Sequence, residues 1–540
     1  MNNANDTHGY TIYPKPATTG AYTPFIYSLV LAFGVVLGFV VNSITTGKES
    51  LLGKQYNKLE DIFNYIELKY VDTVERTALT EKTIEKLFSS LDPHTVYIPA
   101  DETADVNESL EGNFEGIGIE FSVVQDTITV VTVIPGGPSE IIGLKAGDRI
   151  VKINDSTVAG IKIKDNEVKK RLRGPKGTIV KVSVLRSGRN QLLVFDIKRD
   201  KIPLYSVDAA YMLNAETGYI KISNFSSTTH REFAEKVDML NNQGMKKLII
   251  DLRDNPGGYL QAATQIADEL LAGEKLIVFT KGKAYPRQDY KASKPGLFEK
   301  GELRILVNQN SASASEILAG AVQDWDRGII IGRTSFGKGL VQEQYELRDG
   351  SMIRLTVARY YTPSGRCIQR SYSNGVDDYN NEVYQRYLRG DFIHEDTTHT
   401  TDTTVYKTAK GRKVYGGGGI RPDVFVPADT SSELDYILQL RAFVPEFVYK
   451  YTSGNSGFMD SYKDMRQFSE QFAVSALLLN EFYSYAVKAG LKRDITKDIK
   501  SETKLKQYLK AFLAKQQWRL EGYYYIMNQT DEVVNVAEKQ

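Results

Sequence analysis

Three short stretches of the chain carry side chains that together could catalyse acyl transfer. They are residues 310–316, with the sequence Asn-Ser-Ala-Ser-Ala-Ser-Glu, residues 336–339, with the sequence Phe-Gly-Lys-Gly, and Gln342. They supply a hydroxyl nucleophile, an amine that could act as its base, and an amide that could hold the amine in place. The whole chain contains only 5 His. Few histidines are therefore available for a Ser-His-Asp site, and a serine with a lysine base fits the composition better.

The serines of residues 310–316 precede an apolar segment that is expected to form a helix. A serine at the start of a helix lies at the positive end of the helix dipole, beside N–H groups that have no partner within the helix. The alternating alanines would let a substrate backbone approach closely. The alternative is a serine that only caps the helix, and the local sequence alone favours that interpretation.

Lys338 lies between two glycines, which free the backbone to turn the amine inward. A base must be neutral near neutral pH, so the pKa of this lysine would have to fall from roughly 10.4 to about 7–8. This shift corresponds to about 4 kcal/mol and requires an apolar pocket, and a nearby carboxylate would oppose it. Gln342 is a suitable partner, because an amide accepts a hydrogen bond without adding charge. The alternative is an exposed turn with a solvated lysine.

Two glycines, Gly257 and Gly258, follow a buried strand and precede a helix. We expect the N–H of Gly257 or Gly258 to bind the oxyanion of an acyl-transfer intermediate, with the N–H of Ala314 as the second donor. The alternative is a simple strand-to-helix turn, and one segment could serve both purposes.

Residues 113–200 are predicted to form a small β-rich domain. The loop before one of its strands consists of Gly116, Ile117, Gly118 and Ile119. Its N–H groups could hold a peptide carboxylate while the strand edge pairs with the peptide. The region resembles a PDZ domain of the circularly permuted bacterial kind, and residues 144–148, Leu-Lys-Ala-Gly-Asp, match that pattern. The alternative is that the glycines merely make a bend.

Residues 203–428 alternate predicted strands and helices, which indicates a layered α/β domain. A buried strand is expected at residues 247–252, and another strand at residues 303–307. The polar residues 374–413 are expected to form a loop insertion. Residues 430–540 are predicted to form a helical C-terminal extension. The helical ends could build a homodimer, although apolar stripes of this kind usually form a core.

The N-terminus is predicted to carry a membrane anchor. No charged side chain occurs from residue 16 to residue 47, and residues 24–44 supply the roughly 20 apolar residues that a spanning helix needs. A cleaved signal peptide is the alternative, but residues 41–43, Val-Asn-Ser, are a poor cleavage site. We therefore predict a cytoplasmic tail at residues 1–23, a single-pass inner-membrane anchor, a helical region at residues 48–112, and a catalytic part in the periplasm.

The overall composition excludes several classes of partner. The 540 residues have a formal net charge of +1, which does not indicate a nucleic-acid partner. Cysteine and histidine form no cluster with metal-ligand spacing, so neither a metal nor another cofactor is expected. The single cysteine, Cys367, excludes an internal disulfide.

Five motifs, in the same order along the chain, resemble those of the C-terminal processing peptidases, also called tail-specific proteases. They lie at residues 251–258, 311–317, 336–342, 361–365 and 416–423. In that family the middle serine of Ser-Ala-Ser-Ala-Ser is the nucleophile. The base lysine follows 25 positions later, and a glutamine four positions after that. The resemblance therefore implies that Ser313, Lys338 and Gln342 are the catalytic residues.

The resemblance also implies the fold and the substrate. It predicts an α/β multidomain protein whose protease core is similar to the Clp protease and crotonase group, with an inserted PDZ domain, helical N- and C-terminal parts and one N-terminal transmembrane helix. It implies a serine endopeptidase that cleaves proteins near their C-termini and binds protein or peptide substrates through their tails. Arg173, grouped with the peptide-binding loop, is the candidate for the arginine that links PDZ domain and core in some members.

Two other functional classes remain as alternatives. The first is a non-catalytic, membrane-anchored PDZ scaffold, and the complete Ser/Lys/Gln spacing argues against it. The second is a crotonase-like acyl-CoA enzyme, because that fold is shared. The PDZ insertion and the predicted anchor argue against the second class.

Overall fold

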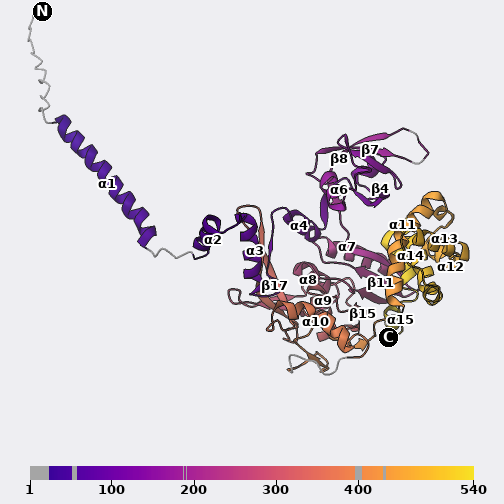
Figure 1. Ribbon diagram of the computed structural model, residues 1–540. Helices are drawn as coiled ribbons and strands as arrows, with labels where there is room; N and C mark the ends of the chain where they lie inside the picture. The colour runs from indigo at the N-terminus through magenta and orange to yellow at the C-terminus, as the bar shows by residue number, and fades with distance from the viewer. Residues whose placement is uncertain are drawn as a thin grey trace, which may run out of the picture. The chain divides into compact units, whose positions relative to one another are not determined.

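A computed structural model describes residues 23–51, 58–186, 188–189, 191–395, 404–429, 433–455 and 457–540 of the protein (Figure 1). The chain divides into two compact units, Met1–Thr83 and Ile84–Gln540. The predicted cytoplasmic tail, residues 1–23, lies outside the described residues except for Thr23.

The first unit is helical. Its elements are α1 (Thr23–Leu51), α2 (Lys58–Lys69) and the first part of α3 (Arg76–Ser89). Arg76 forms ion pairs with Glu60 at 2.6 Å and Glu67 at 2.8 Å, and such exposed pairs add little stability. Within the ranges that the structure describes, no helix is long and apolar enough to cross a membrane. The predicted anchor at residues 24–44 is therefore not confirmed.

The β-rich domain is one antiparallel sheet with the strand order β3-β4-β5-β7-β8, and β6 pairs with β5. The strands are β3 (Ile119–Val124), β4 (Thr127–Val133), β5 (Arg149–Ile153), β6 (Ser156–Thr157), β7 (Ile179–Leu185) and β8 (Leu193–Lys198). Val180, Val182 and Val184 are fully buried on one face of β7, as alternation along a strand requires. The strands that enter and leave the domain, β2 (Asn113–Gly116) and β9 (Asp200–Pro203), pair with each other.

The larger α/β region is built on a six-stranded sheet with the order β10-β11-β12-β15-β16-β21, parallel from β11 onward. The strands are β10 (Val207–Met212), β11 (Thr217–Ile222), β12 (Lys247–Asp251), β15 (Glu302–Val307), β16 (Ile329–Gly332) and β21 (Val424–Phe425). One face is covered by α7 (Thr229–Asn242), α8 (Leu260–Asp268) and α9 (Ala314–Asp324). Because β12, β15 and β16 are parallel neighbours, the loops after them meet at one edge of the sheet.

A second sheet supports the loop that contains Lys338. Its order is β1-β18-β13-β14, and β17 also pairs with β18. The strands are β1 (Val96–Ile98), β13 (Leu276–Lys281), β14 (Gln288–Lys291), β17 (Leu340–Glu346) and β18 (Met352–Tyr361). Lys338 lies two residues before β17, so the long pairing of β17 with β18 fixes the position of this loop.

The prediction of a loop over residues 374–413 was wrong. The segment contains α10 (Val376–Arg389) and the hairpin β19 (Val405–Lys407) and β20 (Lys413–Tyr415). Tyr379 and Arg386, which lie two helical turns apart, are both buried. Because both buried side chains end in polar groups, apolar periodicity does not predict this helix.

The predicted helical C-terminal region is present. It consists of α11 (Leu434–Gly454), α12 (Met465–Gln471), α13 (Ala476–Lys488), α14 (Ile495–Met527) and α15 (Glu532–Lys539). The first four helices share a core rich in aromatic side chains. Val533, Val534 and Ala537 of α15 instead pack on the six-stranded sheet, where Figure 1 shows α15 near β15. In β12 the neighbours Ile249 and Ile250 point to opposite faces, so α15 covers the face away from α8 and α9.

Candidate active site

Three loops at the edge of the six-stranded sheet bring the predicted residues together. One loop follows β12, one follows β15 and one follows β16. They border a cavity of about 950 Å³. The residues that line it include Gly257, Gly258, Ser313, Lys338 and Gln342. The structure therefore brings the predicted nucleophile, base and amide to one cleft.

The three serines of the Ser-Ala-Ser-Ala-Ser segment differ in their surroundings. Ser311 Oγ donates to the carbonyl oxygen of Leu252 at 2.8 Å, and Ser315 Oγ donates to that of Asn255 at 3.0 Å. Both side chains are fully buried, so these hydroxyls tie the serine segment to the neighbouring turn. Ser313 is partly exposed and lines the cavity. It is the serine that a substrate can reach.

The backbone at Ser313 is strained, with φ 54° and ψ −112°. A positive φ is uncommon for a residue with a side chain and costs about 1–3 kcal/mol. Close packing accompanies it: a Cβ at Gly257 would lie 2.8 Å from Ser313 Cβ and 2.7 Å from the carbonyl oxygen of Ala312. Only glycine fits there, because the turn after β12 lies directly against the serine.

Lys338 has the surroundings that a lysine base requires. Its Nζ donates to Gln342 Oε1 at 3.0 Å. Burial lowers the pKa of Lys338 to about 8; the positive charge of Arg354 adds to this shift, whereas Glu316 and Asp92 oppose it. A large fraction of the amine is therefore neutral near pH 8, as general-base catalysis requires. No motif in the sequence predicts a role for Arg354, which lies on β18 and also lines the cavity.

Backbone contacts fix the orientation of the Gln342 amide. Gln342 Nε2 donates to the carbonyl oxygen of His94. Because a carbonyl only accepts, the amide must turn its NH2 to His94 and its oxygen to Lys338. Asp92 holds this turn by accepting from the N–H of His94 at 2.8 Å. Among the described residues, no hydrogen bond joins Lys338 to Ser313, although both line the cavity.

Glu316, which is not among the predicted site residues, connects the nucleophile loop with the base loop. Its carboxylate accepts from Ser313 N at 2.8 Å, Ser335 Oγ at 2.6 Å, Gly337 N at 2.7 Å and Lys338 N at 2.9 Å. Burial raises the pKa of Glu316 to about 7, although these four donors favour the ionised form. Ser313 and Glu316 have the spacing of a capping box at a predicted helix start, and that pattern could have identified Glu316.

Replacing Glu316 by Gln should weaken both the fold and the control of the lysine pKa. Gln keeps the size but turns an NH2 toward two donors, so the free energy of unfolding should fall by about 2 kcal/mol. The carboxylate raises the pKa of Lys338, so its loss should shift the pH–rate profile to lower pH. Urea unfolding and the pH–rate profile test this, with Glu343→Gln outside the cavity as control. Unchanged stability and an unchanged profile would contradict it.

Two N–H groups at the cavity, those of Gly258 and Ala314, have no hydrogen-bond partner within the described part of the protein. The N–H of Gly257 donates to Asn255 Oδ1 at 2.9 Å. Ala314 is the first residue of α9, where the N–H groups have no intrahelical partner. Of the predicted oxyanion donors, the geometry therefore favours Gly258 and Ala314.

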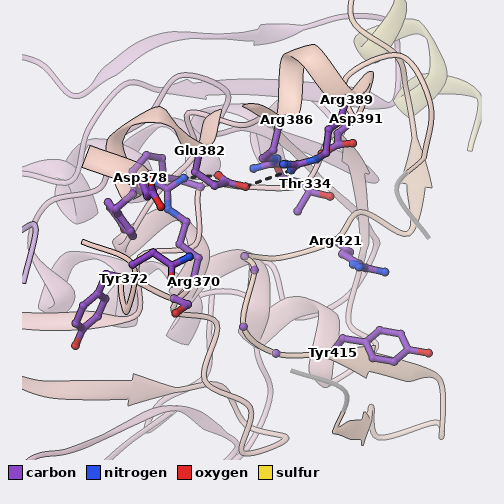
Figure 2. Close-up of a pocket in the computed structure, with 18 of the residues that line it drawn as sticks. Thr334, Arg370, Tyr372, Asp378, Glu382, Arg386, Arg389, Asp391, Tyr415 and Arg421 are labelled. Carbon is purple, nitrogen blue, oxygen red and sulfur yellow. Dashed lines mark hydrogen bonds and ion pairs between the residues drawn. The ribbon is translucent and has the colours of Figure 1, made fainter. Parts of the chain in front are cut away.

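Figure 2 shows a second cavity, of about 300 Å³, which shares no lining residue with the first. Arg370 pairs with Glu382 at 2.5 Å, and Arg386 donates to the carbonyl oxygen of Thr334 at 2.9 Å. The guanidinium of Arg370 also lies 4.0 Å from the ring centroid of Phe336. These side chains brace residues 334–336, which immediately precede Lys338.

The β-rich domain has a separate groove of about 330 Å³. Its apolar lining consists of Phe114, Ile117, Gly118, Ile119, Phe121 and Leu172. Gly116 does not line the groove but pairs with Asp200 between β2 and β9. Arg173 borders the groove, and its guanidinium pairs with Asp105 and Glu108, each at 2.6 Å. Both acids lie on α4 (Thr103–Glu111), whose last turn lines the catalytic cavity.

Three family models match the chain. Peptidase family S41 matches residues 216–378, a PDZ domain matches residues 116–197, and a family of unknown function matches residues 436–519. The first match includes the serine, lysine and glutamine of the cavity. The second includes the apolar groove. The third lies within the C-terminal helices.

Several proteins are similar over most of their length. A carboxy-terminal-processing protease of Bartonella bacilliformis is 35% identical over 351 residues, which are 64% of this chain and 79% of that protein. The carboxy-terminal processing protease CtpA of Bacillus subtilis is 30% identical over 427 residues, 77% of this chain and 89% of that protein. A solved photosystem II D1 C-terminal processing protease is 27% identical, with a TM-score of 0.34, over 68% of this chain and 87% of that one.

These matches define a serine-type peptidase core with a PDZ domain and a helical C-terminal region. The chain belongs to peptidase family S41, and its relatives are carboxy-terminal-processing proteases. The resemblance inferred from the sequence motifs is thereby confirmed. The low TM-score adds nothing to this assignment, which rests on the sequence relatives.

Proposed function

We propose that the protein is an endopeptidase that cleaves other proteins near their C-termini, with Ser313 as nucleophile, Lys338 as general base and Gln342 as the residue that orients Lys338. One observation carries the proposal. The partly buried amine of Lys338, with its pKa lowered to about 8, lines the same cavity as Ser313, the one serine of the segment that is partly exposed.

The reaction is acyl transfer in two halves. Ser313 Oγ attacks the scissile carbonyl carbon while its proton passes to neutral Lys338, and the carbonyl electrons move to an oxygen held by the N–H groups of Gly258 and Ala314. The C–N bond then breaks, and Lys338 gives the proton to the leaving amine. Water attacks the acyl-enzyme, Lys338 takes its proton, and Ser313 is released with its hydroxyl restored.

The PDZ groove is proposed to bind the substrate tail. Its apolar lining fits a hydrophobic terminal side chain, and the edge of β3 can pair with an extended peptide. Binding there would hold the tail near α4, which borders both the groove, through Arg173, and the catalytic cavity.

Two substrates that differ only at the C-terminus test whether the PDZ groove binds the substrate tail. A tagged protein with an apolar C-terminal tail should be cut, whereas the same protein with an amidated C-terminus should be cut more slowly, because the groove would lose the terminal carboxylate. Ile119→Glu in the groove should raise KM about tenfold or more, with kcat little changed, because a charge would be buried against the tail. Mass spectrometry of the products locates the cuts.

The matched control is Ile141→Glu, since Ile141 belongs to the same domain but is 80% exposed and does not line the groove. It should leave KM unchanged. Equal cleavage of free and amidated tails, with no effect of Ile119→Glu, would refute tail binding in the groove. Equal cleavage by Ser313→Ala protein would refute the catalytic assignment.

Three expectations about the surroundings of the enzyme stay predictions. They are attachment to the inner membrane, a catalytic part in the periplasm, and a homodimer. Fractionation of cells that produce the full-length chain would test the first two, and sedimentation of the purified protein would test the third.

A further inference from the structure

The C-terminal extension contacts the turn that carries the oxyanion glycines. Arg253 lies in this turn, just after β12, and Asp531 immediately precedes α15. Arg253 Nη1 donates to both carboxylate oxygens of Asp531, at 3.0 and 2.8 Å. The same guanidinium donates to Asp251 Oδ2 through Nε at 3.0 Å and Nη2 at 2.6 Å. One arginine is therefore shared between the core and a residue 278 positions away.

Asp531 completes a partly buried cluster of four charges. The cluster consists of Lys221, Asp251, Arg253 and Asp531, whose side chains are 6%, 1%, 16% and 26% exposed. Burial would raise the pKa of Asp251, but the charges of Arg253 and Lys221 hold it well below its usual value, so this carboxylate is ionised. The four charges sum to zero only with Asp531, and a buried charge without a partner is costly.

The cluster is connected to the oxyanion turn through the backbone. Lys221 Nζ donates to the carbonyl oxygen of Arg253. Two residues further on, Asn255 donates to β11 through Nδ2 and accepts from the N–H of Gly257 through Oδ1. This arrangement leaves the N–H of Gly258 free to face the cavity. The conformation of the donor turn therefore depends on where Arg253 is held.

Further contacts hold the extension on the sheet. The apolar side of α15 packs against the sheet face away from α9, and Asn528 Nδ2 donates to the hydroxyl of Tyr211 on β10 at 2.7 Å. Lys247 Nζ at the start of β12 donates to the carbonyl oxygen of Glu538 at 2.9 Å. Asp531 is thus presented to Arg253 by a helix that is anchored at both ends.

We infer that the C-terminal extension is a working part of the active site, in which Asp531 is a positioning residue that acts through Arg253 on the turn carrying the Gly258 oxyanion donor. The inference rests on the function proposed above. Asp531 does not line the catalytic cavity, so its removal should affect the chemical step and leave binding of the substrate tail unchanged.

Asp531→Asn tests this inference because it separates charge from helix capping. Asp531 Oδ1 accepts from the N–H of Val534 at 3.0 Å, and Asn caps a helix as well as Asp does. In the full-length enzyme, kcat for a tailed substrate should fall about tenfold or more, because displaced oxyanion donors lose effect steeply. KM should change by less than about twofold, as should the affinity for an uncleaved tail peptide in the Ser313→Ala background.

The matched control is Glu538→Gln, which removes a charge from the same helix. Glu538 Oε1 accepts from Asn214 Nδ2 at 2.6 Å and does not contact the turn that carries Gly258. This variant should leave kcat unchanged. Wild-type kcat in Asp531→Asn would overturn the inference. A fall in kcat with a matching loss of tail binding would also overturn it, by indicating a merely structural role. Wild-type protein that does not cut tailed substrates would instead refute the proposed function, and this inference with it.

Discussion

Ser313→Ala protein should cleave tailed substrates roughly 10⁴-fold more slowly than the wild type, or slower still, and should bind their tails equally well. The reason is that no other hydroxyl of the serine segment is free to attack. Ser311 and Ser315 are buried and donate to backbone carbonyls. Single-turnover cleavage gives the loss, and titration with a labelled tail peptide gives the binding.

Ser311→Ala and Ser315→Ala are the matched comparisons. Each removes one of the two hydrogen bonds that a carbonyl oxygen accepts, so each should lower the free energy of unfolding by about 1 kcal/mol and still produce an active enzyme. A fluorophosphonate probe should label both of these variants and leave Ser313→Ala unlabelled. Labelling of Ser313→Ala at the wild-type rate would assign the nucleophile to another residue.

Lys338→Arg should reduce kcat by about 10²–10⁴-fold, although it keeps both a positive charge and a long side chain. Arginine stays protonated at any pH the protein tolerates and cannot take the serine proton. Lys338→Met, which is also unable to act as a base, should lose activity to a similar extent. Steady-state kinetics on a tailed substrate measures both variants.

Comparing these two variants shows whether Lys338 acts as a base or only as a positive charge that binds the substrate. If Lys338 only attracted an anionic group of the substrate, Lys338→Arg would stay active and Lys338→Met would not. Wild-type turnover by Lys338→Arg would therefore remove Lys338 from the role of base. Retention of tail binding by both variants is the control that the cavity and the groove are intact.

The catalytic residues could be predicted because their signals are local. The spacing from Ser313 to Lys338 and Gln342 is set by the helix α9, the strand β16 and the loop from β16 to β17. The glycines after β12 similarly predict a tight turn. The choice of Ser313 among three serines came from the family resemblance alone. The structure supplies a physical reason for this choice, because the other two hydroxyls are occupied.

Contacts between residues that lie far apart in the sequence have no local sequence pattern that predicts them. Asp531 meets Arg253 across 278 positions, and the carbonyl of His94 meets Gln342 across 248 positions. The helix α10 was missed because its buried side chains are polar. The sequence also does not distinguish Gly257 from Gly258, because the distinction depends on which N–H donates to Asn255 in the folded protein.

The pH dependence of acylation in single turnover tests whether a partly buried, neutral Lys338 activates Ser313. Protonated Lys338 cannot act as a base, so the rate should rise with pH through one ionisation at about 8. In Glu316→Gln this midpoint should move to lower pH. A rate that stays constant from about pH 6 to 10, or that falls as the pH rises through 8, would contradict the account.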